Sequence, residues 1–325
     1  MAFTLAELSK IEKDDLRKSV IDTLLYEAPI MEKLPWETIG RLSTTIVRYQ
    51  DLPSVGFRRI NEGYAEGTGH VEQRTENIAL MGVDLDTDKA IARSKNTIGD
   101  ARSISQQMGL KGMAYNFNDK FINGNPESDP KEFKGIKERI DDLNAEGFTG
   151  QYIDNAGTAG DGVLLSSAER QNFIDKVHAL LYAIKGHKPS ALLMNSDTLL
   201  ALSSALRREG LLSSTKDMFD RRIEMFYDVP MLDMGVQANQ TTEIITSSET
   251  LEDEGAAEST SIYAVKWGIG QYLWGIQEYA MEVDDRGLLE DKPVYRTEID
   301  WPLGLAVADP YSIARLYAII PNAST

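Results

Sequence analysis

The longest regular pattern in this sequence lies between Ala90 and Gly124, where the spacing of apolar residues predicts a single long helix. These residues recur mostly three or four positions apart, so they fall on one face of a helix. They are Ile98, Ala101, Ile104, Met108, Met113, Phe117 and Phe121. Asn123, Gly124 and Pro126 are typical of a helix end. At 1.5 Å per residue the helix would span roughly 50 Å. We therefore expect a long supporting helix with one buried apolar stripe, rather than a helix that packs within a compact core.

The segment before this helix, residues 43–88, has the composition of β-strands but not that of a core. The stretches STTIVRYQ, SVGFRRI, HVEQRTENI and LMGVDLD are rich in β-branched and aromatic residues, and polar, glycine-containing segments separate them. This pattern predicts a long β-hairpin or ribbon. An isolated two-stranded hairpin is marginal in water. The ribbon should therefore lie on another surface, either in its own domain or on a second copy of the chain.

Helical and strand patterns elsewhere predict an α+β protein. Residues 5–33 carry an apolar helical stripe interrupted by Pro29, which predicts an arm that folds on its own domain or reaches a neighbouring subunit. A compact domain of helices and a mixed sheet follows the long helix, with a capping box from Ser166 to Glu169 and a helix over 196–210. Strands are expected at 191–195, 222–232, 241–248, 261–267, 278–283, 294–299 and 313–320.

The charge balance excludes one large class of function. Thirty-four lysines and arginines against fifty-one aspartates and glutamates leave a net charge of −17. Such a protein cannot coat nucleic acid by releasing counterions, so it is not a general DNA binder. Acidity keeps a concentrated protein soluble, and it would also keep a container from adhering to a polyanionic cargo. Composition alone favours the first explanation.

The chain has no run of eighteen apolar residues, and its start, MAFTLAELSKIEKDD, lacks the basic and apolar regions of a signal peptide. We therefore expect a soluble protein, made inside the cell and without a membrane partner. The absence of cysteine excludes disulfides, thiolate metal sites and cysteine nucleophiles.

No constellation of residues predicts catalysis, a cofactor or a metal. Asp84, Asp86 and Asp88 begin like the calcium loop of an EF-hand, but Lys89 stands where glycine is needed and Lys95 where glutamate is needed. The glycine-rich segments lack the order of a nucleotide-binding turn, and the three histidines are too scattered for a triad. We expect no enzyme. An α/β enzyme with an unrecognised acidic site stays as an alternative, because folding can bring distant carboxylates together.

The order of these parts resembles the major capsid proteins of tailed bacteriophages, which have the HK97-like fold. The segments that carry the resemblance are FINGNPESDPKEFKGI, ALLMNSDTLLALSSALRREG, YDVPML, SIYAVKWG and VYRTEIDWPLGLAVADPYSIARLYAI. The resemblance implies an N-terminal arm (1–41), an extended E-loop hairpin (42–92), a spine helix with the first part of a P-domain (93–132), a mixed α/β A-domain (133–270), P-domain strands (271–308) and a C-terminal strand that returns to the A-domain (309–325).

This resemblance also implies a function and partners. Copies of the chain would form pentamers and hexamers that close into an icosahedral shell around double-stranded DNA, without sequence-specific binding. A separate scaffolding protein and a portal protein are expected partners, and a decoration protein is a further candidate. The shell would belong to the virion and assemble in the bacterial host cytoplasm. An encapsulin-like nanocompartment shell, which encloses an enzyme, is the nearest alternative.

Two expectations concern the E-loop. Arg58, Arg59, Glu62 and Glu66 are candidates for ion pairs at the rim of an inter-subunit contact. Some relatives lock the shell with an isopeptide bond from an E-loop lysine. No lysine lies between Lys33 and Lys89, so we expect no covalent cross-link.

Overall fold

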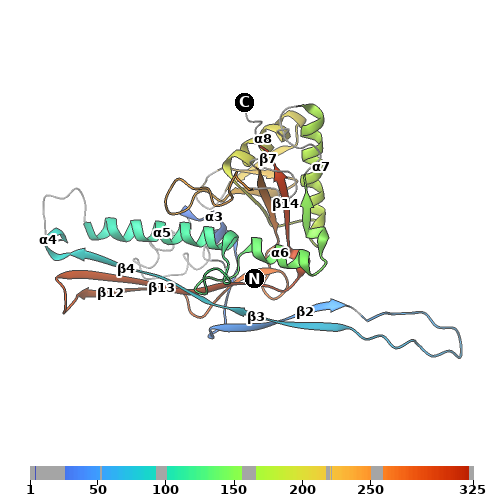
Figure 1. The fold of residues 1–325 in the computed structure, drawn as a ribbon, viewed down its shortest axis with the longest axis horizontal. Helices are drawn as coiled ribbons and strands as arrows, with labels where there is room; N and C mark the ends of the chain where they lie inside the picture. Colours follow the sequence, from blue (N-terminus) through green and yellow to red (C-terminus); the bar gives the residue numbers. More distant parts are fainter. Residues whose placement is uncertain are drawn as a thin grey trace.

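The computed structural model describes residues 4, 26–51, 53–92, 101–155, 166–216, 220, 222–249 and 259–321. Two sheets with their helices form a body, and a two-stranded hairpin extends beyond it (Figure 1). The expected α+β class is therefore confirmed. Most of the expected arm over 5–33 lies outside the described residues, and α3 (Pro29–Lys33) is the described helix within it. None of the described helices is long and apolar enough to cross a membrane.

A seven-stranded sheet and two helices form one part of the body. The apolar stripes of α7 (Ser167–Ala183) and α8 (Ser196–Glu209) share a buried cluster with the strands, which includes Leu180, Leu202 and Leu192. In spatial order the strands are β5 (Tyr152–Asp154), β14 (Ile313–Ile319), β10 (Thr260–Val265), β6 (Ala191–Met194), β9 (Val229–Asp233), β8 (Arg222–Phe226) and β7 (Leu212–Lys216).

The ends of these two helices follow from local chemistry. Ser166 accepts a hydrogen bond from the backbone N–H of Glu169, and the Asn195 side chain accepts one from Thr198 N–H. Gly210 ends α8 with φ 72°, a left-handed conformation that glycine adopts without steric cost. The predicted capping box and the predicted limits of α8 are confirmed.

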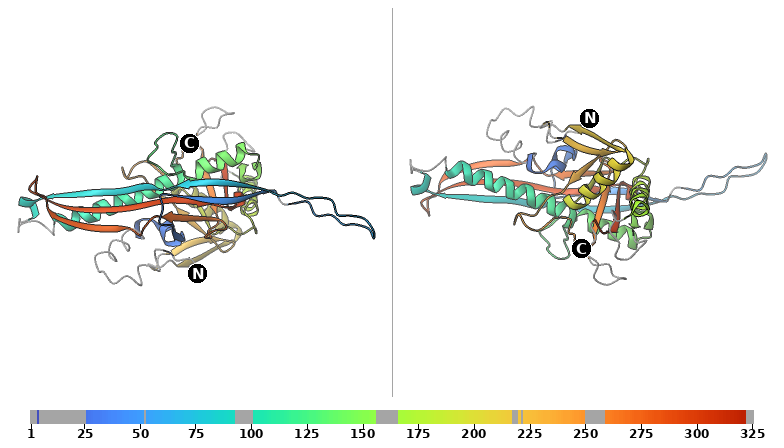
Figure 2. Two further views of the ribbon diagram at one scale, coloured as in Figure 1. Left: turned by 90° about the horizontal axis from the view of Figure 1, so that it is seen from below. Right: turned by 90° about the horizontal axis from the view of Figure 1, so that it is seen from above.

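A second, five-stranded sheet forms the elongated part of the body. Its longest pairing joins β4 (Ala79–Asp88) to β13 (Val294–Val307), from Ala79 opposite Leu303 to Asp88 opposite Val294. The other strands are β1 (Trp36–Thr38), β11 (Leu273–Gln277) and β12 (Glu282–Leu288). The helix α5 (Ala101–Asn123) lies along this sheet (Figures 1 and 2).

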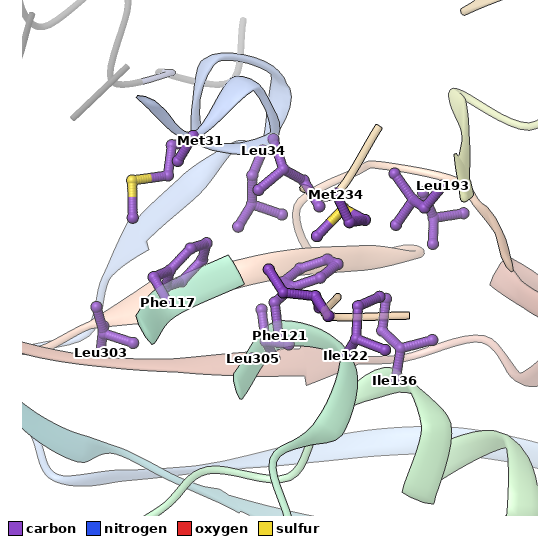
Figure 3. Packing of buried hydrophobic residues seen from close by; sticks show 14 of the residues in the cluster. Met31, Leu34, Phe117, Phe121, Ile122, Ile136, Leu193, Met234, Leu303 and Leu305 are labelled. Atoms are coloured by element: carbon purple, nitrogen blue, oxygen red, sulfur yellow. The ribbon is translucent and has the colours of Figure 1, made fainter. Parts of the chain in front are cut away.

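The C-terminal half of α5 joins the two sheets. Its Phe117 and Phe121 are fully buried, and the ring of Phe117 lies 5.9 Å from that of Trp36 and 6.4 Å from that of Trp301. Figure 3 shows this cluster continuing to Leu193 of the seven-stranded sheet. The body therefore has one large core centred on the end of α5 and a smaller one under α7 and α8.

After α5, the backbone at Gly124 lies very close to the backbone at Phe133. A Cβ atom at Gly124 would lie 2.4 Å from the carbonyl oxygen of Phe133, so only glycine fits there. The following helix, α6 (Ile136–Ala145), packs its buried Ile136 and Ile140 into the large core. The remaining short elements are α4 (Lys89–Ala92) and the 3₁₀ helices η1 (Thr149–Gln151) and η2 (Pro310–Ser312).

The predicted helix over 90–124 is described as two helices, α4 and α5, and residues 93–100 between them lie outside the described part. Its predicted end is confirmed, since α5 ends at Asn123. The prediction of a single buried stripe is correct only for the C-terminal half of α5. Met113 is 4 % exposed, whereas Ile104 is 43 % and Met108 69 % exposed. The N-terminal half of α5 thus extends past the core that buries the other half.

Several predicted strands differ from the structure. The stretches 54–60 and 241–248 form no strand, and only the last two residues of 278–283 belong to a strand, β12, which begins at Glu282 and continues to Leu288. The stretch 222–232 contains two strands, because Tyr227 and Asp228 both have positive φ and reverse the chain between β8 and β9. LMGVDLD does not extend the ribbon, since β4 pairs with β13 instead. Partners far apart in the sequence decided this pairing.

One residue of β14 has a conformation that its side chain disfavours. Ala318 has φ 62°, at the place where the register between β10 and β14 shifts. The left-handed region costs a residue with a Cβ roughly 1–2 kcal/mol. We expect Ala318→Gly to raise the free energy of unfolding by about 1 kcal/mol, measured by urea titration of unassembled subunits.

The matched control is Ala314→Gly in the same strand, where the backbone is ordinary and the residue is fully buried. Glycine in a strand interior costs about 0.5–1 kcal/mol, so this variant should be destabilised. Equal destabilisation of both variants would contradict the assignment of strain to Ala318.

Candidate assembly interface

The hairpin is formed by β2 (Ser43–Asp51) and β3 (His70–Asn77), which pair antiparallel with Ser43 opposite Asn77. Residues 53–69 connect the two strands beyond the body without helix or strand (Figure 2). All of these connecting residues are exposed. We call residues 53–69 the hairpin tip.

The hairpin tip carries large apolar side chains that its own subunit leaves uncovered. They are Val55, Phe57, Ile60 and Tyr64, of which Phe57 is fully exposed and Ile60 is 91 % exposed. Single exposed apolar residues are normal on soluble proteins, but a cluster of them marks an interaction surface. The hairpin tip therefore has the composition of a surface that binds another protein.

The four predicted interface residues all lie in this exposed tip. Arg58 donates to the Glu62 carbonyl oxygen at 3.2 Å, and its guanidinium lies 5.0 Å from the centre of the Tyr64 ring. The backbone N–H of Arg59 donates to Glu62 Oε2 at 3.0 Å. These contacts hold a turn within the tip, whereas Glu66 stands apart from that turn and is exposed. Their predicted role in contacts between subunits stays a prediction.

The part of the hairpin nearest the body has an unusual distribution of polarity. On the face toward the body, Arg48 and Glu76 are buried, and Glu72 and Arg74 are half-buried. The opposite, exposed face is uncharged and carries Thr45, Val47, Val71, Gln73 and Thr75. A half-buried hairpin normally places apolar residues inward. Here charged residues make the contact with the body.

The innermost contact is an ion pair between β3 and α6. Arg139 donates to Glu76 Oε1 at 2.6 Å and to Glu76 Oε2 at 2.7 Å, and both residues are at least 90 % buried. The same guanidinium donates to the carbonyl oxygens of Leu305 at 3.0 Å and Lys134 at 3.1 Å. Bidentate geometry and these carbonyl partners compensate for removing both charges from water.

A second contact lies at the end of α6, where Glu146 follows the helix. Arg48 donates to Glu146 Oε2 at 2.5 Å, Arg74 also donates to Glu146, and Arg48 pairs with Glu72 at 2.9 Å. Burial raises the pKa of Glu146, but the hydrogen bonds from Arg48 and Arg74 outweigh burial and lower the pKa below its ordinary value. Glu146 therefore stays ionised at neutral pH.

We use the name root network for the charged residues at this junction. It comprises Arg48, Glu72, Arg74, Glu76, Lys134, Arg139, Asp142 and Glu146. Sequence analysis missed it, although the alternation of Glu72, Arg74 and Glu76 along HVEQRTEN was a signal for one charged face. The partners on α6 could not be inferred, because the contact depends on the tertiary structure.

A second exposed apolar surface lies on α5. Ile104 and Met108 are spaced one helical turn apart on the half of α5 that extends past the core. The other exposed apolar side chains nearby belong to different elements, namely Ile91 of α4 and Leu288 of β12. These residues are available for contact with another copy of the chain.

The described residues lack a candidate metal site but form a groove beside α8. No group of three or more histidines, aspartates and glutamates that could hold a metal occurs among those residues. A groove of about 520 Å³ runs between α8 and the β8–β9 pair, but its walls include Leu199, Leu200 and Met231.

Comparison with known proteins points to shell-forming proteins. Residues 12–168 match the family model described as Major capsid protein GP7. No curated protein sequence matches the chain.

Solved structures share the fold over nearly the whole chain. One is the holo-SrpI encapsulin complex from Synechococcus elongatus PCC 7942, with 13 % identity, a TM-score of 0.62, and 91 % of this chain and 89 % of that chain covered. The capsid of the native GTA particle has 14 % identity and a TM-score of 0.58, with 91 % and 90 % covered. The structure titled Microbacterium phage Oxtober96 has 9 % identity and a TM-score of 0.56, with 89 % and 90 % covered.

At these identities the structural matches establish the fold, and the family model adds the kind of protein. The encapsulin has the same fold, but the matching family model describes a major capsid protein. The family model covers residues 12–168, just under half of the chain, and together with the shared fold it supports an HK97-like major capsid protein.

Proposed function

We propose that this chain forms pentamers and hexamers that close into an icosahedral shell around the double-stranded DNA genome of a tailed bacteriophage. The observation that carries the proposal is the hairpin tip. It exposes Val55, Phe57, Ile60 and Tyr64 beyond the body of its own subunit. A second copy of the chain is the partner that a self-assembling shell supplies in every direction.

Each segment of the chain would form a different part of the shell subunit. Residues 1–41 would be an arm and 42–92 the E-loop, whose strands β2 and β3 support the hairpin tip. Residues 93–132 and 271–308 would form the P-domain around α5. Residues 133–270 and 309–325 would form the A-domain, which carries the seven-stranded sheet and gathers around the five-fold and six-fold axes.

The contact between neighbours would be heterologous, with the hairpin tip of one copy on the P-domain of the next. Such contacts close into rings when the rotation between neighbours is a simple fraction of a turn. The exposed Ile104 and Met108 on α5 are candidates for the receiving surface. Arg58, Arg59, Glu62 and Glu66 would lie at the rim, where each ion pair contributes about 0–1 kcal/mol.

The charge of the chain fits a container for DNA. A net charge of −17 does not favour general binding to the phosphate backbone of the genome. The DNA would be enclosed without sequence-specific binding. Assembly would take place in the bacterial host cytoplasm with a separate scaffolding protein and a portal protein, and a decoration protein is a further candidate partner.

An encapsulin-like compartment is the second candidate, because the SrpI encapsulin shares the fold with a TM-score of 0.62. Electron microscopy of the protein expressed alone, after size-exclusion chromatography, separates the possibilities. Closed shells or ringed capsomers would support assembly, and DNA or protein inside shells from the natural source would decide between capsid and compartment. A stable monomer that does not assemble with its scaffolding protein would contradict both.

The hairpin tip should be essential for closed shells. We expect the double variant Phe57→Ser with Ile60→Ser to fold normally, because both side chains are exposed in the subunit, but to form no closed shells. Circular dichroism would measure the fold, and electron microscopy would measure the shells.

The matched control is Phe57→Leu with Ile60→Val, which keeps both positions apolar. This variant should still assemble. Normal shells from the serine variant would refute the role of the hairpin tip.

Mature particles should contain no covalent oligomers. The hairpin has no lysine amine to form an isopeptide bond, since none lies between Lys33 and Lys89. Denaturing gel electrophoresis of purified particles should give this protein as a single monomer band. A ladder of dimers and higher oligomers that resists boiling would contradict the prediction.

A further inference from the structure

The hairpin is joined to the body by two short connections that lie together. Residues 39–42 lead from β1 into β2, and the exposed Gly40 there has φ 60° with no atom within 4 Å of a Cβ position. Ile78 alone separates β3 from β4, and its N–H donates to the Leu42 carbonyl oxygen at 2.9 Å. These two connections, joined to each other by a hydrogen bond, form a line that can act as a hinge axis for the hairpin.

Apolar contact between the hairpin and the body includes a small cluster near this line. Ile46 and Ile78 pack with Trp274, Ile276 and Ala306 in a small cluster separate from the two main cores. Ion pairs of the root network lie on both sides of Ile46, since Glu76 is opposite Thr44 and Arg48 follows Ile46 along β2. The apolar cluster fixes where the hairpin is attached, and the ion pairs hold it against α6.

The root network contains charged groups from both strands, from the loop before α6 and from α6 with its end. β2 contributes Arg48, β3 contributes Glu72, Arg74 and Glu76, the loop before α6 contributes Lys134, and α6 with its end contributes Arg139, Asp142 and Glu146. The network contains equal numbers of positively and negatively charged groups. A cavity of about 270 Å³ lies among Arg48, Arg74, Arg139 and their neighbours, so the junction is not close-packed.

We propose that the root network is an electrostatic latch that sets the angle between the hairpin and the body, and that screening or protonating its charges frees the hairpin to swing while the body stays folded. The latch itself is a property of the single subunit. Its use in assembly rests on the proposed function, in which the same chain would occupy both pentamers and hexamers.

The two layers of the network respond differently to salt. The Debye length falls from about 10 Å at 0.1 M salt to about 3 Å at 1 M, but buried pairs are screened much less than exposed ones. Glu76 and Arg139 are buried, whereas Glu146 and Arg74 keep about 30 % of their side-chain surface exposed. High salt should therefore weaken the Glu146 contacts first and leave the Glu76 pair as a pivot.

Lowering the pH should weaken the latch, as raising the salt concentration does. The pKa of Glu146 is lowered while Arg48 and Arg74 hold it, so the ionised carboxylate favours the latched state above its ordinary pKa. This contribution disappears as the pH falls through the lowered pKa. Hydrogen bonds from the two arginines then face a neutral carboxyl group, and the hairpin should loosen progressively as the pH falls below the ordinary pKa of a glutamate.

The absence of native cysteine makes the angle measurable in the full chain. Spin labels at Gln73→Cys on the exposed face of β3 and Gln171→Cys on α7 would report the distance between the hairpin and the body. A second pair, Gln171→Cys with Glu127→Cys, would report the body alone. All three positions are exposed. Pulsed electron paramagnetic resonance would be recorded on free subunits separated by size-exclusion chromatography.

We expect a narrow hairpin-to-body distance distribution at 0.1 M salt that broadens at about 1 M salt. Glu146→Gln should broaden it already at low salt, since the substitution keeps the size of the side chain and removes its charge. Glu290→Gln, at an exposed position in the turn between β12 and β13, is the matched control and should leave it narrow. The pair within the body should stay narrow in every case.

Two results would overturn the latch. One is an unchanged hairpin distribution in both Glu146→Gln and high salt, which would mean that ion pairs do not set the angle. The other is equal broadening of the pair within the body, which would mean that the subunit loosens as a whole. Shell formation is scored separately by electron microscopy, so a rigid hairpin in a chain that assembles would refute the latch and leave the proposed function standing.

Discussion

The face of the β2–β3 hairpin that meets the body is charged. The way in which the hairpin projects from the body depends on this constraint. A hairpin with Arg48, Arg74 and Glu76 directed inward cannot sink into a core, because each buried charge needs a partner. The hairpin therefore projects from the body, with Glu76 bound to Arg139 at its base. Projection places the apolar tip where its own subunit leaves it uncovered.

The two kinds of contact in the subunit differ in strength and in geometric tolerance. Burying a large apolar side chain such as Phe117 contributes about 1.5–3 kcal/mol, and close packing accepts only one arrangement. Partly exposed ion pairs such as those of Glu146 contribute about 0–1 kcal/mol each and tolerate small displacements. The core around α5 thus fixes the body, while the hairpin can adopt a new angle at small cost.

Sequence patterns predicted the elements whose ends depend on local chemistry. The cap from Ser166 to Glu169 and the stop at Gly210 follow from hydrogen bonds and backbone conformations within a few residues. The stripe on α5 was only half correct. Met113 is buried as expected, but Met108 is exposed, because periodicity shows which side of a helix is apolar and not how far the core extends along it.

The sequence by itself determined the class of the fold, the extended ribbon without a core and the absence of a lysine in it, because composition and short-range spacing decide these properties. Only the tertiary structure decided that β4 pairs with β13, and that Glu76 of the hairpin finds Arg139 of α6. Both contacts join segments far apart in the chain. Many distant residues carry suitable side chains, and the folded backbone selects which of them come within bonding distance.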